Sequence, residues 1–322
     1  MYTDGEFGLP LLMGDEASDA AGRTVRLLSK LLRREGPDSP PKLLHHYTTA
    51  EGVIGILRSE ELWATNVLYL NDSEEIEDGI RHFDLLRKDV WNRSTQIGRW
   101  VLAAVLAVLR DPPIRTFVTC FCEDGDLLGQ WRGYAPFGGG YSIAIPSRTL
   151  LDQAHGASER GEPRFLQRVI YDEAEKNAIL RRYARAFVSA VAPHADEFSF
   201  RRKSSKKFLL EASMFMAGML IPRIAAFKNE KFAAEREWRL LAAGHSTTGA
   251  NELRFRSRNG VVVPYVGLRM SASQAGRAFP TTQIRAGPFA DPFLPVQGIR
   301  DMLGALQYRN VEVVRSAVPL RF

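Results

Sequence analysis

Cysteine is scarce in this 322-residue chain, which contains only Cys120 and Cys122. Two residues at that spacing point to the same face of an extended strand, a geometry that does not favour a disulfide between them. The count and the spacing give neither a disulfide framework nor a zinc-binding pattern. We therefore expect both residues to be small apolar strand residues.

The chain also lacks a long uninterrupted apolar run. Its first twenty residues are acidic and have neither the basic segment nor the apolar stretch of a signal peptide, so we expect a cytoplasmic protein. The nearest approach to a membrane span is 208–227, but Glu211 lies inside it and Pro222-Arg223 interrupts it. This stretch is predicted to be a buried helix, and no membrane partner is expected.

A strong charge of one sign is absent as well. The net charge of +6 comes from 43 Lys and Arg against 37 Asp and Glu, which permits a polyanionic partner without requiring one. Basic residues gather in 23–34 and 201–207. Each cluster is either a solvated helix face or a contact for nucleic acid.

Hydrophobic residues make up 45% of the chain, enough for a sizeable core in one large domain or two average ones. Residues 1–41 are predicted to be an N-terminal extension, with a basic amphipathic helix followed by a proline-rich linker at 36–41. The main domain is expected to cover 42–322. Strand-like segments dominate it except at 172–227, which is predicted to be a helical insertion, and the fold class is therefore α+β.

The segment Ala233–Leu241 is predicted to be a strand that carries Glu235 and Glu237 on one face. Trp238 and Leu240 would then face the other way, as expected for a strand with one buried side. The two carboxylates either line a cleft or belong to a solvated face, where they would pair with arginines.

An early strand at 43–48 is predicted to end beside the N-terminus of a helix at 50–59, which Thr48 or Thr49 can cap. This arrangement places His46 where polar or anionic ligands are commonly bound. The alternative is a core histidine satisfied by the backbone. Asn71 and Asp72 similarly read either as helix caps or as ligand contacts.

Several short motifs occur in a characteristic order: HYT at 46–48, YLND at 69–72, an aromatic pair at Trp131 and Tyr134, a glycine-rich strand at 138–142, and Phe227-Lys228 before EREWR. A closing Ile-x-x-Gly-Pro and Ser316 follow. In this order they resemble the bacterial domain-of-unknown-function family 2971 from about residue 42 to the end. The sequence departs from that family at Ser73, where proline is usual, at Cys120 and Cys122, where serines are usual, and in its N-terminal extension.

That family is in turn remotely similar to the ADP-ribosyltransferase superfamily, whose members fold as a split β-sandwich around a cleft for NAD. The resemblance implies that Glu237 is the catalytic glutamate and that Glu235, as the first carboxylate of the E-x-E pair, acts as general base. Tyr47 departs from the small residue common there in toxin-type members. The expected NAD contacts are His46, Tyr47, Thr48, Asn66, Asn71, Trp131, Tyr134 and Arg239.

The resemblance therefore implies an ADP-ribosyltransferase or NAD glycohydrolase acting on a macromolecular acceptor, which could be protein, DNA or RNA. Such an activity would suit a toxin or an anti-phage defence effector held by a regulatory partner protein. A carboxylate near the ribose has a clear purpose, since loss of nicotinamide builds an oxocarbenium-like cation. No metal is expected. The alternatives are a non-catalytic nucleotide sensor and a nucleic-acid-binding or processing protein.

Overall fold

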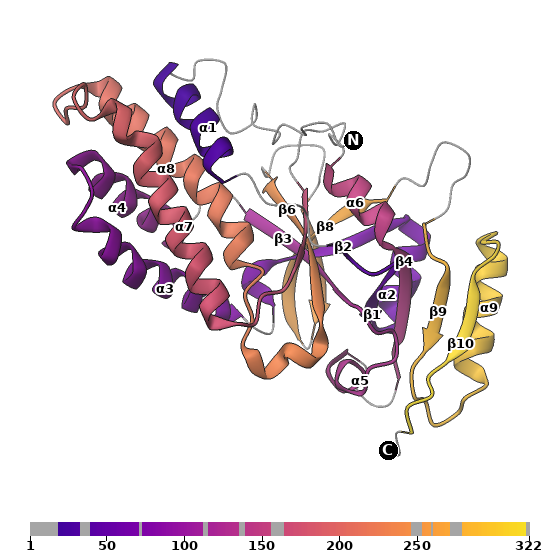
Figure 1. The fold of residues 1–322 in the computed structure, drawn as a ribbon. Helices are drawn as coiled ribbons and strands as arrows, with labels where there is room; N and C mark the ends of the chain where they lie inside the picture. The colour runs from indigo at the N-terminus through magenta and orange to yellow at the C-terminus, as the bar shows by residue number, and fades with distance from the viewer. Residues whose placement is uncertain are drawn as a thin grey trace.

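A computed structural model describes residues 19–32, 39–70, 73–111, 115–134, 139–155, 164–245, 253–258, 260–270 and 279–319 (Figure 1). Within these ranges ten strands form one mixed sheet, which confirms the α+β class. The strands are β1 (Leu43–Thr48), β2 (Glu61–Asn66), β3 (Arg115–Cys122), β4 (Tyr141–Pro146), β5 (Arg164–Arg168), β6 (Glu237–His245), β7 (Arg254–Arg258), β8 (Val261–Arg269), β9 (Gln283–Ala286) and β10 (Glu312–Arg315).

The sheet branches at β3. Its main path runs β10-β9-β4-β1-β3-β2-β8-β7, while β6 pairs with the other edge of β3 and carries β5 beyond it. All pairs are antiparallel except β9 with β10. Along one edge β3 is paired with β6 from Arg115 to Cys122, whereas its opposite edge is shared between β1 at one end and β2 at the other.

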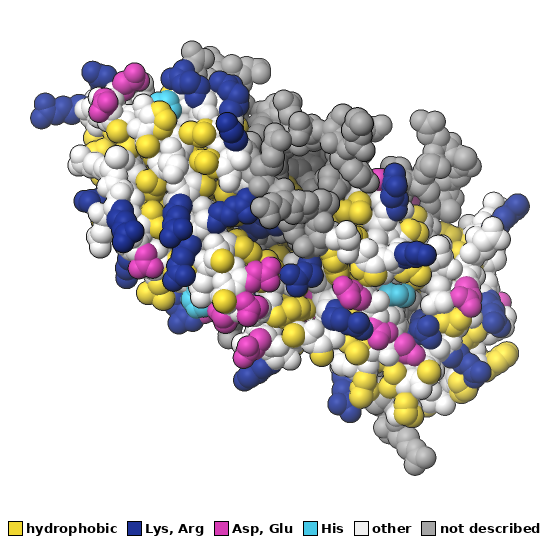
Figure 2. All heavy atoms as spheres, viewed as in Figure 1, with side chains coloured by type: hydrophobic (Ala, Val, Ile, Leu, Met, Phe, Trp, Pro, Cys, Tyr) yellow, Lys and Arg dark blue, Asp and Glu magenta, His cyan; other side chains and the backbone are white. Residues whose placement is uncertain are grey.

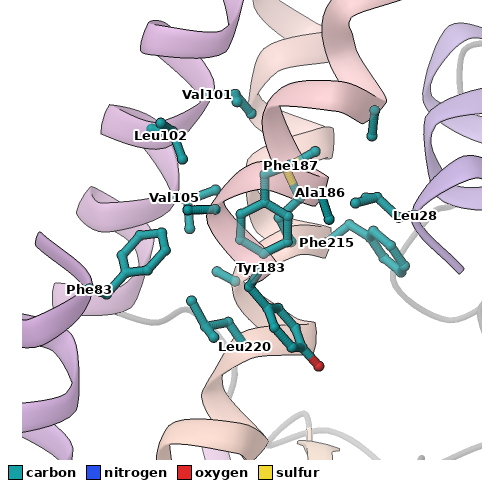
Figure 3. Packing of buried hydrophobic residues seen from close by; sticks show 14 of the residues in the cluster. Leu28, Phe83, Val101, Leu102, Val105, Tyr183, Ala186, Phe187, Phe215 and Leu220 are labelled. Atoms are coloured by element: carbon teal, nitrogen blue, oxygen red, sulfur yellow. The ribbon is translucent and has the colours of Figure 1, made fainter. Parts of the chain in front are cut away.

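A helical bundle stands beside the sheet (Figure 1). Its buried residues come from five helices and form one large apolar cluster, part of which is drawn in Figure 3. In Figure 3 the ring of Phe187 lies between Phe83 and Phe215, with Val101 above it. The helices are α1 (Asp19–Leu31), α3 (Ser73–Trp91), α4 (Gln96–Arg110), α7 (Glu173–Val191) and α8 (Lys203–Ile224).

The helices predicted as an insertion are thus two of the five in this bundle, because α7 and α8 pack against α3, α4 and α1. The helix of the N-terminal extension also contributes to the core through Val25, Leu28 and Leu32. Ten residues of α8 are buried, as expected for 208–227. None of the helices in the described ranges is long and apolar enough to cross a membrane.

A second apolar cluster covers one face of the sheet. It joins Leu44, Phe117, Phe121, Trp238 and Leu240 of the central strands to three helices. These are α2 (Ala50–Ser59), α6 (Ser147–His155) and α9 (Leu294–Ala305). The short helix α5 (Leu128–Tyr134) follows β3 and lies near β1. Trp238 and Leu240 belong to this core. Glu237 and Arg239, which alternate with them along β6, must therefore face the other side of the sheet.

Candidate functional site

The branch point of the sheet leaves a gap between β1 and β3. Their only register pair is His45 with Cys122, after which β1 leaves β3, and β2 joins it at Val118. The carbonyl of Cys120 lies in between, and His46 Nδ1 lies 2.9 Å from it. The imidazole thus takes the place of a ladder partner, because a buried carbonyl needs a hydrogen-bond donor.

This bond fixes the form of the His46 ring. A carbonyl oxygen only accepts hydrogen bonds, so Nδ1 carries the proton and Nε2 keeps its lone pair. Burial is the main cause that lowers the pKa of His46 to about 4; the bond to the Cys120 carbonyl acts in the opposite direction, and the charge of Arg256 acts in the same direction as burial. His46 is therefore a neutral hydrogen-bond acceptor at neutral pH.

The lowered pKa of His46 predicts an acid-dependent loss of stability. Between pH 6.5 and about pH 4 the unfolded imidazole binds a proton that the folded one does not. The free energy of unfolding should therefore fall as the pH is lowered through this range, with part of the fall due to His46. In a His46→Asn variant, whose amide can still donate to the Cys120 carbonyl, the slope of unfolding free energy against pH should be smaller. An unchanged slope would contradict this assignment.

The strand predicted at Ala233–Leu241 begins later than expected. Residues Glu230–Glu235 form a 3₁₀ helix, Arg236 adopts a left-handed conformation with φ of 44°, and β6 starts at Glu237. The prediction that Glu235 and Glu237 lie on one face of a single strand is therefore wrong. They still approach the same point, because Lys228 Nζ lies 2.8 Å from Glu235 Oε2 and 3.1 Å from Glu237 Oε2.

The carboxylate of Glu237 is buried and densely bonded. Arg239 donates from Nε to Oε1 at 2.8 Å and from Nη2 to Oε2 at 3.2 Å, and the Cys120 thiol also hydrogen-bonds to Glu237. Burial alone would raise the pKa of Glu237, but Arg239 and Lys228 outweigh it and lower the pKa to about 2. Glu237 is therefore ionised throughout the physiological range, although its side chain is only 5% exposed.

His46 and Glu237 line one small cavity. It lies over the end of β3, with β1 on one side and β6 on the other, and has a volume of about 30 Å³. Strand alternation places His46 on the face of Leu44 and Glu237 on the opposite face, but β1 has left β3 at this point and the imidazole turns into the gap. The lining residues are His45, His46, Tyr47, Cys120, Phe121, Cys122, Gln130 and Glu237.

A volume of this size holds one or two water molecules and no nucleotide. The structure thus shows the His46–Glu237 pair in a closed arrangement. Within the described ranges there is no group of three or more His, Cys, Asp or Glu side chains that could hold a metal ion.

Tyr47 and Trp131 serve to hold the loop after β3. The Tyr47 hydroxyl donates to the Asp124 carbonyl at 2.9 Å and accepts from the Leu127 amide at 2.8 Å. Trp131 packs edge-on against Tyr47, with ring centroids 4.7 Å apart, and donates from its indole nitrogen to Asp126 at 2.8 Å. Tyr47 still lines the cavity, whereas Trp131 does not and is 1% exposed.

Three other predicted contacts have partners within the protein. Thr48 lies against Gly52 at the start of α2, while Thr49 provides the cap. Asn66 caps the 3₁₀ turn Val67–Tyr69 by accepting from the Leu68 amide at 3.0 Å. Arg239 holds Glu237 and donates to the Ala225 carbonyl at 2.7 Å. Asn71 and the side chain of Tyr134 lie outside the described residues.

The comparisons with known proteins bear on part of this site. Residues 130–240 match the family model described as Protein of unknown function (DUF2971). The resemblance to that family is confirmed over this stretch, which contains Trp131, Lys228 and the Glu-x-Glu pair but not His46. Neither the curated proteins nor the solved structures give a match.

The sequence motifs had assigned no function to two side chains of the site. Lys228 bridges both glutamates, and the Tyr171 hydroxyl accepts a hydrogen bond from the Glu237 amide at 2.9 Å. Lys228 directly follows an apolar helix and precedes the glutamates by a few residues, which is a usable signal for an ion pair. Tyr171 carries no such signal, because its contact depends on a bridge between Ile170 and Phe227.

Proposed function

We propose that the protein binds NAD at the branch of the sheet and cleaves its nicotinamide–ribose bond, passing ADP-ribose to a macromolecular acceptor or to water. The observation that carries this proposal is the convergence of His46 and Glu237 on one cavity. It is the arrangement expected from the resemblance to ADP-ribosyltransferases. The gap at β3 is also compatible with the split sheet of that superfamily.

The proposed chemistry uses the ionised state of Glu237. As the C1′–N1 bond breaks, nicotinamide leaves with the electron pair and positive charge builds on the ribose, which a nearby carboxylate stabilises. An acceptor hydroxyl, amine or water would then attack C1′ and lose its proton to Glu235, the more accessible carboxylate of the pair. His46 Nε2 would accept a hydrogen bond from a ribose hydroxyl.

Binding requires that the closed cavity opens, since about 30 Å³ admits only water. Among the groups bonded to Glu237, the Cys120 thiol is the weakest donor. A ribose hydroxyl could therefore replace the thiol while Arg239 and Lys228 remain in place. This exchange would put the substrate on the side of Glu237 that faces β3.

The test is incubation of the purified protein with NAD labelled in its adenosine part, with and without cell lysate. We expect release of nicotinamide and, with lysate, transfer of label to macromolecules; loss of that label on nuclease treatment would identify a nucleic-acid acceptor. The His46→Asn variant keeps a donor for Cys120 but lacks Nε2, and should lose about tenfold to a hundredfold in cleavage rate. Absence of cleavage by the wild-type protein under both conditions would refute the proposed reaction.

One observation favours a second candidate, a non-catalytic nucleotide-binding module. Glu237 is already bonded to Arg239, Lys228 and Cys120, so its carboxylate is satisfied without a ligand. A protein that keeps this cluster only to shape a binding site would bind NAD without releasing nicotinamide. Equilibrium binding measured beside the cleavage assay separates the two candidates.

A nucleic-acid partner has support at a different place. A groove of about 490 Å³ between α1 and α7 is lined by arginines and apolar residues, and Lys and Arg side chains gather over this part of the face shown in Figure 2. Of these, Arg181 also lies 4.0 Å from Asp89. Helix α1, which reaches this groove through Leu31, also carries exposed basic residues, and positive charge of this kind would attract phosphates. The basic residues of the two helices are Arg23, Arg26 and Lys30 on α1 and Arg181, Arg182 and Arg185 on α7.

A further inference from the structure

Arg256 is a cation for which the part of the chain that the structure describes provides no carboxylate partner. It lies in β7 between Arg254 and Arg258, and alternation puts all three on one face. Arg254 donates to Glu61 at 2.6 Å. Arg256 instead donates from Nη2 to the Thr65 hydroxyl at 2.8 Å, and its buried Nε has no hydrogen-bond partner among the described residues.

Two aromatic rings hold the Arg256 guanidinium. Its central carbon lies 5.4 Å from the centre of the Trp63 ring and 5.7 Å from that of Tyr265, and the two ring centroids are 5.2 Å apart. Trp63 in turn lies against Gly55 of α2, where a Cβ would collide with the indole. Contacts on this scale orient a guanidinium and leave its N–H edge for hydrogen bonding.

This arrangement is costly without an anion. Burial lowers the pKa of Arg256, and the like charge of Arg258 adds to that effect. The Nε donor of this half-buried side chain loses its hydration without replacement. A phosphate would supply both the missing charge and the missing acceptor, because its oxygens match the fork of an arginine.

The position of Arg256 relates it to the site already described. Thr65 pairs with Val118, which pairs with Leu241, and Leu241 lies on the same face of β6 as Glu237. Arg256 therefore donates its hydrogen bond to Thr65 on the face of the sheet that carries Glu237. Its charge also reaches His46, where it contributes to lowering the pKa of the imidazole.

We propose that Arg256, held against the rings of Trp63 and Tyr265, is the anchor of a phosphate-binding subsite that takes the pyrophosphate of a dinucleotide whose ribose lies between His46 and Glu237. This assignment rests on the function proposed above for the ligand's identity. The phosphate subsite itself depends only on the surroundings of Arg256.

The test compares wild type, Arg256→Gln and Arg269→Gln by isothermal titration calorimetry with NAD, ADP-ribose and nicotinamide riboside, which lacks phosphate. Arg269 lies on the neighbouring strand β8 with a 70% exposed side chain, so its loss changes the net charge equally. We expect Arg256→Gln to weaken binding of NAD and ADP-ribose by about tenfold to a hundredfold and to leave the riboside unchanged. Arg269→Gln should bind all three as the wild type does.

A thermal melt distinguishes this role from a structural one. Removal of an unpaired charge should leave the midpoint of unfolding unchanged or raise it, whereas a purely structural Arg256 predicts a lower midpoint without selective loss of phosphate-bearing ligands. Equal binding of NAD by wild type and Arg256→Gln would overturn the subsite and leave NAD cleavage standing. Binding of ADP-ribose through Arg256 without any NAD cleavage would uphold the subsite and overturn the reaction. Absence of binding by the wild-type protein would overturn both.

Discussion

Replacement of Glu237 by glutamine should lower the free energy of unfolding by about 3–5 kcal/mol, the usual effect of removing one partner from a buried ion pair. The substitution leaves Lys228 and Arg239 close together, 4% and 2% exposed, with one carboxylate fewer to balance them. Urea denaturation of the two proteins at neutral pH measures the difference. A matched Glu235→Gln variant should lose much less, because Glu235 bonds only Lys228 in the cluster and is 23% exposed.

The same effect should appear on acidification of the wild-type protein. The pKa of Glu237 lies at about 2 in the folded protein against an ordinary 4.5, so its contribution is present above pH 4.5 and is lost as the pH falls towards 2. This difference corresponds to about 3 kcal/mol, in agreement with the value expected for the substitution. The Glu237→Gln variant should lack this part of the acid dependence. Equal stability of variant and wild type at neutral pH would show that the cluster is not closed in solution.

The largest effect on activity is expected from a double variant, Glu237→Gln with Lys228→Gln. One negative and one positive charge are removed together, which leaves Glu235 and Arg239 to balance each other and should restore much of the stability lost in the single variant. Without the carboxylate, cleavage of NAD should slow by about a hundredfold to a thousandfold. The rate of nicotinamide release from protein shown to be folded by circular dichroism measures this.

Two controls make that result specific. Asp152→Asn removes a carboxylate that is 66% exposed on α6 and should leave the rate unchanged. A double variant that unfolds as the wild type does and still releases nicotinamide at the wild-type rate would exclude Glu237 from the chemistry. The ion cluster would then be a structural feature of β6.

Local sequence signals predict the early part of the site well. The strand at 43–48 and the helix at 50–59 agree with the structure, since the β-rich run and the cap at Thr49 are both local features. The helix α6 and the short strand β5 were not predicted, and β5 is held mainly by its pairing with β6.

The late part of the site depends on tertiary structure. Arg236 takes a positive φ although it is not a glycine, and no residue pattern marks that conformation in advance. The side chains of Glu235 and Glu237 meet through Lys228 and not by strand alternation. Aromatic residues such as Trp131 look the same in sequence whether they bind a ligand or, as here, pack behind a loop. The family match begins at residue 130, beyond His46, so it does not test the pairing of His46 with Glu237, which is seen only in the fold.

The branch of the sheet at β3 also determines which strands can separate most easily. On its β1 side, β3 is joined by one register pair and by the bond from His46 to the Cys120 carbonyl, whereas on its β6 side the ladder keeps one register from Thr116 to Cys122. Separation of β1 from β3 would therefore break this register pair and the imidazole bond, and would leave the ladder between β3 and β6 intact. In the proposed complex His46 would thus contact the ligand, and the hydrogen bond between His46 and the Cys120 carbonyl would break when the ligand enters.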